Sequence, residues 1–456
     1  MSGAAVASRT GLGTHAKHAL LLAGFGGLLF YVTRTVPEMH GGLWTIAAIG
    51  FLLLAGTLLG ELLAPFGLPN VTSYMLAGIA AGPHLLRLVD AQTVKSLSPV
   101  NTLALSLIAL AGGAELDAAV VRRASRRLAW ATLVQCFLVL VLVTGAFLAA
   151  RPLNQFARGL PLAPLLGAAL LWGALAVTRS PSATLGILSQ TRATGPLASF
   201  TLAFVMTSDV VVVVVFAAVL ACVRPLIDPA ASFSFDAFVA LGHDLFGSIA
   251  LGTTLGLVIA AYLRLVNRQM LVVLLVLGFG ASTILDYLQF DSLLTFMVAG
   301  FIVRNMSKQG HKLISYIEQT GTVVYVVFFA TAGADLDVPL LRELWPVALL
   351  LAGARAAFTY TGSRLSARIA RDPPVLRTWG WSGLVSQAGL SLGLAVIVAR
   401  EFPGIGAPLR ALVIATVAIN QMVGPILFKL GLDRSKETSR IRPASFPSMP
   451  PPPVPG

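Results

Sequence analysis

Long runs without any charged side chain constrain this chain more than any other feature. Residues 128–150 and 159–178 form uncharged, mostly apolar runs of 23 and 20 residues. At about 1.5 Å per helical residue, each run can span a hydrocarbon core about 30 Å thick. Only 11% of the chain is charged, whereas soluble domains carry about 25% charged residues. A β-barrel would show alternating segments of about 10 residues instead of continuous apolar runs. The sequence therefore predicts an all-α polytopic membrane protein.

Apolar segments recur along the chain and divide it into three parts. Residues 1–43 form an N-terminal segment with one additional span, residues 44–430 the transmembrane domain, and residues 431–456 a Pro-rich tail expected to be disordered. No small-residue cleavage site follows the first span, which favours an uncleaved anchor over a signal peptide. The fourteen expected spans lie near residues 18–34, 44–64, 70–86, 100–117, 128–150, 162–190, 198–222, 243–264, 269–286, 291–304, 318–334, 343–364, 378–399 and 407–430.

The net charge of +13 follows the predicted topology. Lys and Arg gather in the cytoplasmic loops of membrane proteins. With fourteen spans, 21 basic residues fall on the side that holds both termini and nine on the other side. The sequence therefore predicts cytoplasmic N- and C-termini, and the positive charge does not indicate a nucleic-acid partner.

The two halves of the chain contain similar motifs. Residues 73–79 (SYMLAGI) match residues 295–301 (TFMVAGF) at an offset of 222, and residues 111–117 (AGGAELD) match residues 331–337 (TAGADLD) at an offset of 220. The matched spans are seven apart, an odd number, so they run in opposite directions through the membrane. The sequence predicts an inverted repeat, as in many transporters.

Two spans in equivalent positions of this repeat are interrupted by polar residues. One contains Thr178, Ser180 and Pro181, and its partner contains Ser386, Gln387 and Gly389. Pro181 disfavours a continuous helix, and polar residues with a glycine interrupt the partner span. Pro and Gly also simply kink membrane helices. The symmetric placement instead favours paired broken helices that cross at a transport site near the membrane midplane.

Asp209 lies near the middle of the otherwise uncharged stretch 193–223. An Asp at the bilayer centre costs about 2.5–3.5 kcal/mol, so its side chain is expected to face the protein interior or water. A buried carboxylate can exchange a proton for a cation, because both neutralise the same charge. Ser208, Thr178 and Ser180 would add hard oxygen ligands suited to an alkali cation. The alternative is a structural ion pair that holds the helices together.

Two arginines also lie inside spans. Arg355 is expected to pair with Asp209, with a carbonyl cluster at a broken helix, or with another acidic group. Arg179 lies within the first break, where its guanidinium could bind the carbonyls that Pro181 leaves free. Both are predicted to be counter-charges inside the membrane.

Other kinds of site lack a sequence signal. The six histidines lie at span edges or in loops without metal-ligand spacing, and the chain contains no phosphate-binding loop. No nucleophile and base stand out as a catalytic pair. The sequence predicts no cofactor, no metal site beyond the alkali cation, no ATP-driven transport and no enzyme.

Together these features resemble the monovalent cation:proton antiporter-2 family, within the sodium/proton exchanger fold group. The resemblance covers about residues 44–430 and is most specific over 178–222, where a Ser-Pro break, the Gly195-Pro196 turn and Asp209 follow in order. Supporting motifs are Leu68-Pro69, residues 76–78 with Gly82-Pro83, residues 111–117, Phe328-Phe329 with residues 333–337, and Ser386-Gln387.

The resemblance implies thirteen transmembrane helices, with the first span as an addition. It implies a core subdomain, in which two broken helices cross beside the ion-binding Asp, interleaved with a dimerisation subdomain. It further implies elevator-like alternating access by a homodimer in a cell membrane, such as a bacterial inner membrane.

Carried over to this sequence, the resemblance makes Asp209 the carboxylate that binds the cation or the proton. Arg355 matches a position that holds Lys or Arg in many members. Ser208 departs from the two-carboxylate form of the family associated with electrogenic exchange, so we expect electroneutral antiport of Na⁺ or K⁺ against H⁺. Arg179 is not expected inside the break.

Two alternatives to antiport stay open at this point. The same scaffold could form a channel-like or facilitative ion pathway. It could also be a transport-inactive sensor or assembly protein whose cation site is occupied by Arg179 or Arg355.

Overall fold

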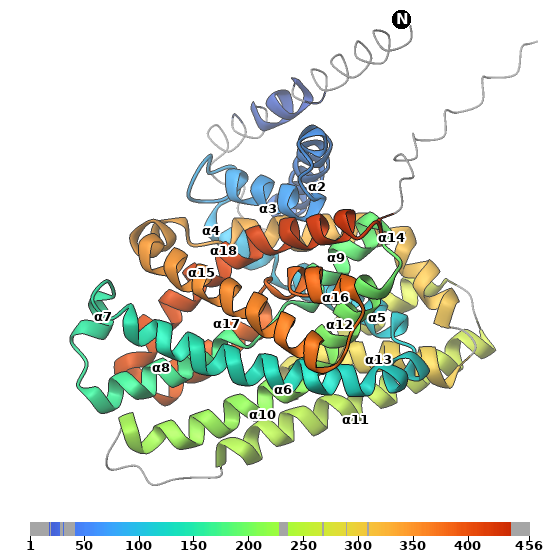
Figure 1. Ribbon diagram of the computed structural model, residues 1–456. Coiled ribbons are helices and arrows are strands. Elements are labelled where there is room, and N and C mark those ends of the chain that lie inside the picture. Colours follow the sequence, from blue (N-terminus) through green and yellow to red (C-terminus); the bar gives the residue numbers. More distant parts are fainter. Residues whose placement is uncertain are drawn as a thin grey trace, which may run out of the picture.

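Every regular element among the described residues is helical (Figure 1). The computed structural model describes His18, residues 20–27, Tyr31, and residues 42–227, 236–266, 269–288, 290–307 and 310–438. The first expected span, 18–34, lies partly outside the described residues, as does the tail from residue 439 onward.

Each of the thirteen spans expected between residues 44 and 430 contains at least one helix. Two spans are interrupted, one between α8 and α9 and the other between α16 and α17. The helices are α2 (Gly42–Leu63), α3 (Asn70–Ala81), α4 (Ala91–Ser96), α5 (Ser98–Glu115), α6 (Ala118–Ala149), α7 (Gln155–Arg158), α8 (Leu162–Ala176), α9 (Pro181–Thr191), α10 (Pro196–Ile227), α11 (Asp236–Leu265), α12 (Met270–Leu288), α13 (Ser292–Met306), α14 (Gly310–Ala334), α15 (Val338–Ile369), α16 (Pro374–Trp379), α17 (Gly389–Glu401) and α18 (Pro403–Arg434), with 3-10 turns η1 (Ala64–Phe66) and η2 (Ser382–Leu384).

Length and hydropathy support a multi-pass membrane protein. Six segments of the described chain are long and apolar enough to cross a membrane, among them 162–191, which joins α8 and α9. A further candidate is the pair α14 and α15, whose axes bend by 82° between residues 334 and 338. Other expected spans fall on shorter helices such as α13, which has 15 residues.

The repeat is visible in how its glycines pack. α3 lies against α14, and α13 lies against α5, so equivalent helices make equivalent pairs. A Cβ added at Gly78 would lie 1.9 Å from the carbonyl oxygen of Ala330, and one added at Gly300 would lie 2.0 Å from that of Leu110. Both glycines therefore allow two backbones to approach more closely than any side chain permits.

The second motif of the repeat lies on the other helix of each pair, α5 and α14, and its glycines face α13 and α3. A Cβ at Gly113 would lie 1.9 Å from the carbonyl oxygen of Met297, and one at Gly333 would lie 2.2 Å from that of Met75. The two helices that follow these motifs, α6 and α15, both contain 32 residues. Asp337 caps the second of them by accepting a hydrogen bond from Leu340 N at 2.9 Å.

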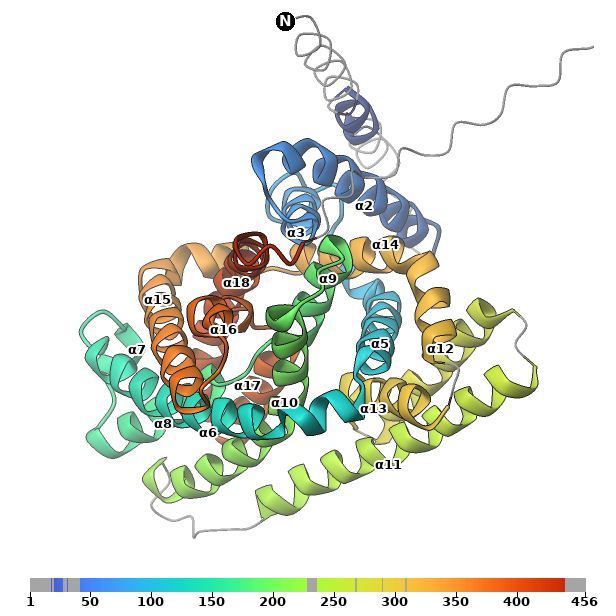
Figure 2. The same cartoon turned by 45° about the vertical axis from the view of Figure 1, so that its right-hand side comes forward.

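The helix that carries Asp209 packs against several elements of the site. α10 contacts α8 and α9 on either side of the first break, and it also contacts α6 and α11. In Figure 1, α6, α10 and α11 lie in the lower part of the view, and Figure 2 shows the same helices turned by 45°. α10 therefore brings its middle residues to the broken helices.

Candidate functional site

The first break separates α8 from α9 at residues 177–180. Pro181 occupies the first turn of α9, where its missing N–H group costs nothing. Ser180 has extended backbone and caps α9, its Oγ accepting a hydrogen bond from Ala183 N at 3.2 Å. The Ser-Pro pair thus ends one helix and starts another inside a single expected span.

The second break lies between α16 and α17. After the short turn η2, residues 385–388 have no regular structure, and α17 begins at Gly389. Ser386 and Gln387 lie in this segment and are buried. The structure therefore contains both interruptions that the sequence predicts.

Side chains join the two breaks directly. Gln387 Nε2 donates to Leu175 O at 3.1 Å and to Thr178 Oγ1 at 3.0 Å. Thr178 also forms a short hydrogen bond with Ser391 on α17. Asn420 Nδ2 on α18 donates to Gln387 Oε1 at 2.7 Å, which orients the amide. This network holds the end of α8 against the second break.

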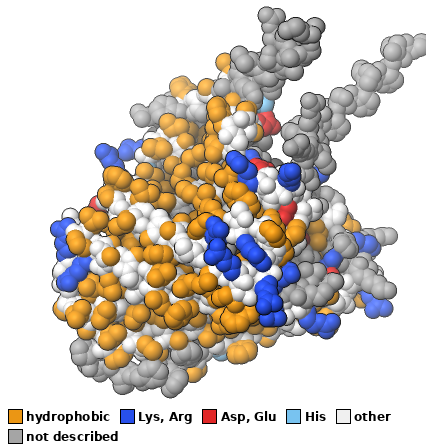
Figure 3. Space-filling view, viewed as in Figure 1, with side chains coloured by type: hydrophobic (Ala, Val, Ile, Leu, Met, Phe, Trp, Pro, Cys, Tyr) orange, Lys and Arg blue, Asp and Glu red, His pale blue; other side chains and the backbone are white. Residues whose placement is uncertain are grey.

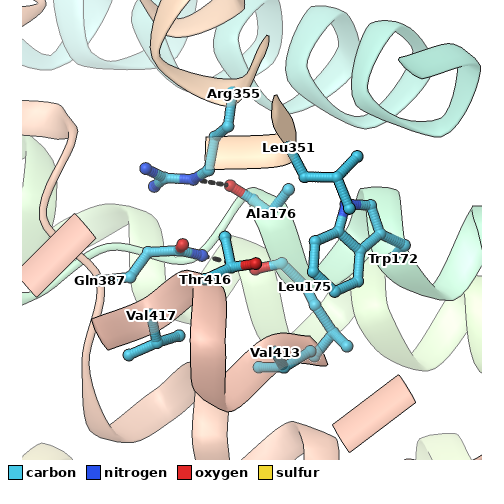
Figure 4. A pocket seen from close by; sticks show the side chains of 9 residues that line it. All are labelled: Trp172, Leu175, Ala176, Leu351, Arg355, Gln387, Val413, Thr416 and Val417. Carbon is cyan, nitrogen blue, oxygen red and sulfur yellow. Dashed lines mark hydrogen bonds between the residues drawn. The ribbon is translucent and has the colours of Figure 1, made fainter. Parts of the chain in front are cut away.

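Arg355 binds backbone carbonyls at both breaks, and Figure 4 shows its bond to Ala176. Its Nε donates to Ala176 O at 2.7 Å, its Nη2 to Thr178 O at 2.7 Å, and its Nη1 to Val385 O at 2.6 Å. The C-terminal end of a helix carries partial negative charge, which a cation stabilises. Of the three partners that the sequence left open for Arg355, the structure selects the carbonyl cluster.

Arg179 binds a carbonyl within the first break, as the sequence predicts. It is 2% exposed, its Nη1 donates to Val177 O at 2.9 Å, and its guanidinium lies 4.6 Å from the ring centroid of Phe204. An arginine over an aromatic face gains a cation–π interaction. Its Nε makes no hydrogen bond within the described part of the chain.

Asp209 is buried near the middle of α10 without an ion pair. Its side chain is 8% exposed, and no Lys, Arg or His nitrogen of the described residues lies within 4.0 Å of its carboxylate. Its Oδ1 also accepts no hydrogen bond from them. Buried charges in proteins are normally paired or bound to a cation. Asp209 is therefore an acceptor available to a proton or a cation.

The predicted hydroxyl ligands are engaged elsewhere. Ser208 Oγ donates to Val205 O at 3.1 Å within α10. Thr178 Oγ1 donates to Leu175 O at 2.7 Å, and Ser180 caps α9. The structure gives none of these hydroxyls a hydrogen bond to Asp209, so their role as cation ligands stays a prediction.

A cavity lies beside the crossing, on the side of α15 and α18. Arg355 and Gln387 line it together with Trp172, Thr416 and apolar side chains (Figure 4). Trp172 Nε1 and Thr416 Oγ1 are buried and have no hydrogen-bond partner among the described residues. The cavity includes no residue of α10, so it is separate from Asp209.

A residue beyond the last span holds the start of α10. Glu437 is buried, and its two carboxylate oxygens accept hydrogen bonds from Leu197 N and Ala198 N, both at 2.8 Å. Its carbonyl oxygen accepts a third from Thr194 N at 3.0 Å. Negative charge stabilises a helix N-terminus. Helix α18 and Glu437 thus extend past residue 430, the expected end of the transmembrane domain.

Sequence reasoning missed several members of this site. Asn420, Ser391 and Glu437 were not singled out, although Asn420 is a polar residue inside an apolar span, which is the signal that identified Asp209. Glu437 carries no such signal, because its partners lie about 240 residues earlier in the chain.

Comparison with known proteins decides the family. A profile described as "Sodium/hydrogen exchanger, transmembrane" matches residues 41–430, a range that includes both breaks, α10 and Arg355. The chain belongs to the sodium/hydrogen exchanger family. The predicted resemblance to monovalent cation:proton antiporters and the predicted multi-pass membrane fold are thereby confirmed.

One curated protein and one solved structure are similar to this exchanger family member. The chain is 27% identical over 284 residues to the Na⁺/H⁺ antiporter NhaP of Pseudomonas aeruginosa, a match that covers 58% of this chain and 64% of that protein. Its fold is similar to that of the sodium proton antiporter MjNhaP1 from Methanocaldococcus jannaschii at pH 8, with a TM-score of 0.64 and 17% identity over 85% of this chain and 96% of that one.

Proposed function

We propose that this protein is a secondary antiporter that exchanges Na⁺ or K⁺ for H⁺, with Asp209 binding either ion in turn. The observation that carries the proposal is the Asp209 carboxylate, buried in the middle of an apolar helix and without an ion pair among the described residues. A proton and a monovalent cation each neutralise that carboxylate, so they compete for it. The name of the P. aeruginosa relative, a Na⁺/H⁺ antiporter, supports the same activity.

The placement of the arginines favours transport over a self-occupied site. Arg355 uses its donors on carbonyls of both breaks, and Arg179 lies on Phe204. Neither forms an ion pair with Asp209. Nothing in the geometry favours the inactive sensor or a channel as a second candidate.

The number of carboxylates supports a stoichiometry of one proton per cation. Ser208, not a second acid, precedes Asp209, and its hydroxyl is bonded within α10. One carboxylate exchanges one proton for one monovalent cation, which moves no net charge. We propose electroneutral exchange by a homodimer in a cell membrane with both termini in the cytoplasm.

Proteoliposomes that report internal pH test the activity. Addition of Na⁺ or K⁺ outside acid-loaded vesicles containing the wild-type protein should raise the internal pH, and Asp209→Asn should abolish this change. Asp335→Asn is a matched control, because Asp335 is exposed and follows α14, and it should retain the flux. Unchanged flux in Asp209→Asn would contradict the mechanism. A current on a supported membrane would contradict electroneutrality.

A further inference from the structure

A group of basic side chains gathers where the start of α6 meets the end of α15 and α16 (Figure 3). Every member is an arginine, and all are exposed except one that is half-buried. We call this group the arginine patch, and it comprises Arg122, Arg126, Arg127, Arg364, Arg368, Arg371 and Arg377.

Specific contacts assemble the patch from segments far apart in the sequence. Arg127 Nε lies 3.1 Å from Asp372 Oδ1, just after the end of α15. More than two turns further along the same helix pair, Gln135 Nε2 donates to Thr359 O at 3.1 Å. The two helices therefore run antiparallel here and bring their arginines onto one surface.

The helices that carry the patch contain few acidic residues. Residues 118–149 contain no Asp or Glu, and residues 344–400 contain only Asp372, which is 2% exposed and already bound to Arg127. The patch is therefore a surface that attracts an anion.

Apolar and aromatic side chains adjoin the patch. Leu365 and Ile369 are exposed at the same end of α15, and Leu133 is exposed further along α6. Tyr360 packs edge-on against Trp381 and bonds Arg364. Exposed aliphatic side chains bounded by Trp, Tyr and Arg are typical of the level at which lipid headgroups meet acyl chains.

We propose that the arginine patch binds the headgroup phosphate of an anionic phospholipid, whose acyl chains lie along the exposed aliphatic side chains of α6 and α15. Guanidinium groups match phosphate oxygens as two-pronged donors. The adjoining apolar surface favours a lipid over a free phosphate, which has no chains to place there. The bound lipid bridges α6 to α15 and α16, and this inference is independent of the role of Asp209.

Thermal unfolding of the delipidated full-length protein in neutral detergent tests the proposal. Phosphatidylglycerol should raise the unfolding midpoint of the wild type more than phosphatidylcholine does, and glycerol phosphate at the same concentration should have no effect. The triple variant Arg126→Gln, Arg368→Gln, Arg377→Gln should lose the difference between the two lipids. The control triple Arg342→Gln, Arg400→Gln, Arg410→Gln removes as many exposed charges elsewhere and should keep it.

Two results would overturn the proposal. One is a phosphatidylglycerol effect of equal size in both triple variants, and the other is an equal effect of glycerol phosphate on the wild type. If the patch variant cannot be purified, the salt dependence of the lipid effect on the wild-type protein tests the proposal instead. Raising salt from about 0.1 M to about 1 M shortens the screening length from about 10 Å to about 3 Å. The lipid difference should then disappear, and its persistence would contradict headgroup recognition by the arginines.

Discussion

The two halves of this molecule share a scaffold but differ in charge. α10 and α18 both contain 32 residues and begin at a proline. Asp209 and Thr416 each lie thirteen residues after that proline, and both are buried with an oxygen that lacks a hydrogen-bond partner in the described chain. The first half thus places a carboxylate where the second places a hydroxyl.

The counter-charge, Arg355, lies in the second half, and its equivalent in the first half is uncharged. α6 and α15 begin 220 residues apart, and the same offset relates Gln135 to Arg355. Both side chains are buried, but Gln135 bonds only one carbonyl, that of Thr359, whereas Arg355 bonds carbonyls of both breaks. The comparison teaches that the broken-helix architecture is duplicated, while the free carboxylate comes from the first half and the arginine that joins the breaks from the second.

The largest expected effect concerns the unequal pair on α10 and α18. Asp209→Thr gives the first half the side chain of the second, and we expect ion-driven proton flux in proteoliposomes to fall to the level of protein-free vesicles. Thr416→Val removes a hydroxyl without a partner and should change stability by less than about 1 kcal/mol and retain flux. Loss of flux in Thr416→Val with Asp209→Thr active would reverse the assignment.

The second largest effect concerns the unequal pair on α6 and α15. Arg355→Gln removes charge-assisted hydrogen bonds to the helix end, each worth about 1.5–3 kcal/mol, so we expect a large fall in the unfolding midpoint. Gln135→Met removes one hydrogen bond and should cost about 1 kcal/mol. Thermal unfolding in detergent measures both. Similar midpoints for the two variants would show that Arg355 does not tie the breaks together.

The shared scaffold predicts equal effects at equivalent glycines. Gly78→Ala and Gly300→Ala would each push a methyl group to about 2 Å from a facing carbonyl oxygen. Overpacking of this kind costs about 1–3 kcal/mol, which outweighs the gain in helix propensity. Gly280→Ala, where nothing lies within 4 Å, is the control and should not lower the unfolding midpoint. A loss confined to one of the two packed glycines would argue against equivalent packing in the two halves.

The smallest expected effect concerns the difference between the N-termini of α10 and α18. Glu437 binds the start of α10, whereas α18 has no side-chain cap. Glu437→Ala should cost about 0.5–2 kcal/mol, as for other helix caps, and Glu437→Gln, which can still accept one bond, should cost less. Hydrogen exchange at residues 197–199 should rise in Glu437→Ala. Unchanged exchange there would show that the cap does not hold α10.

The sequence alone predicts the scaffold well, because apolar runs and matched glycine motifs are local signals. The two breaks could be predicted from Pro181 and from the polar residues 386–387 for the same reason. Arg355 shows the limit of this reasoning. Its partners are backbone carbonyls, which every residue carries, so the sequence left three possibilities open.

Contacts between distant segments explain the other differences. Glu437 was assigned to the disordered tail because composition reports flexibility and not a partner far back in the chain. Asp337 lies at the end of the second repeat motif and caps α15. Its place directly before a long helix is the pattern of an N-cap, so this contact was available to sequence reasoning.

Competition between cation and proton at Asp209 is the central claim, and proton release on cation binding tests it most directly. Na⁺ or K⁺ added to the purified protein in weakly buffered detergent should displace protons that a pH dye detects, because a cation binds the deprotonated ligand. The account predicts release of about one proton per bound cation in the wild type, since one carboxylate is involved, and none in Asp209→Asn. Equal proton release in the variant, or cation binding to the wild type without any release, would contradict it.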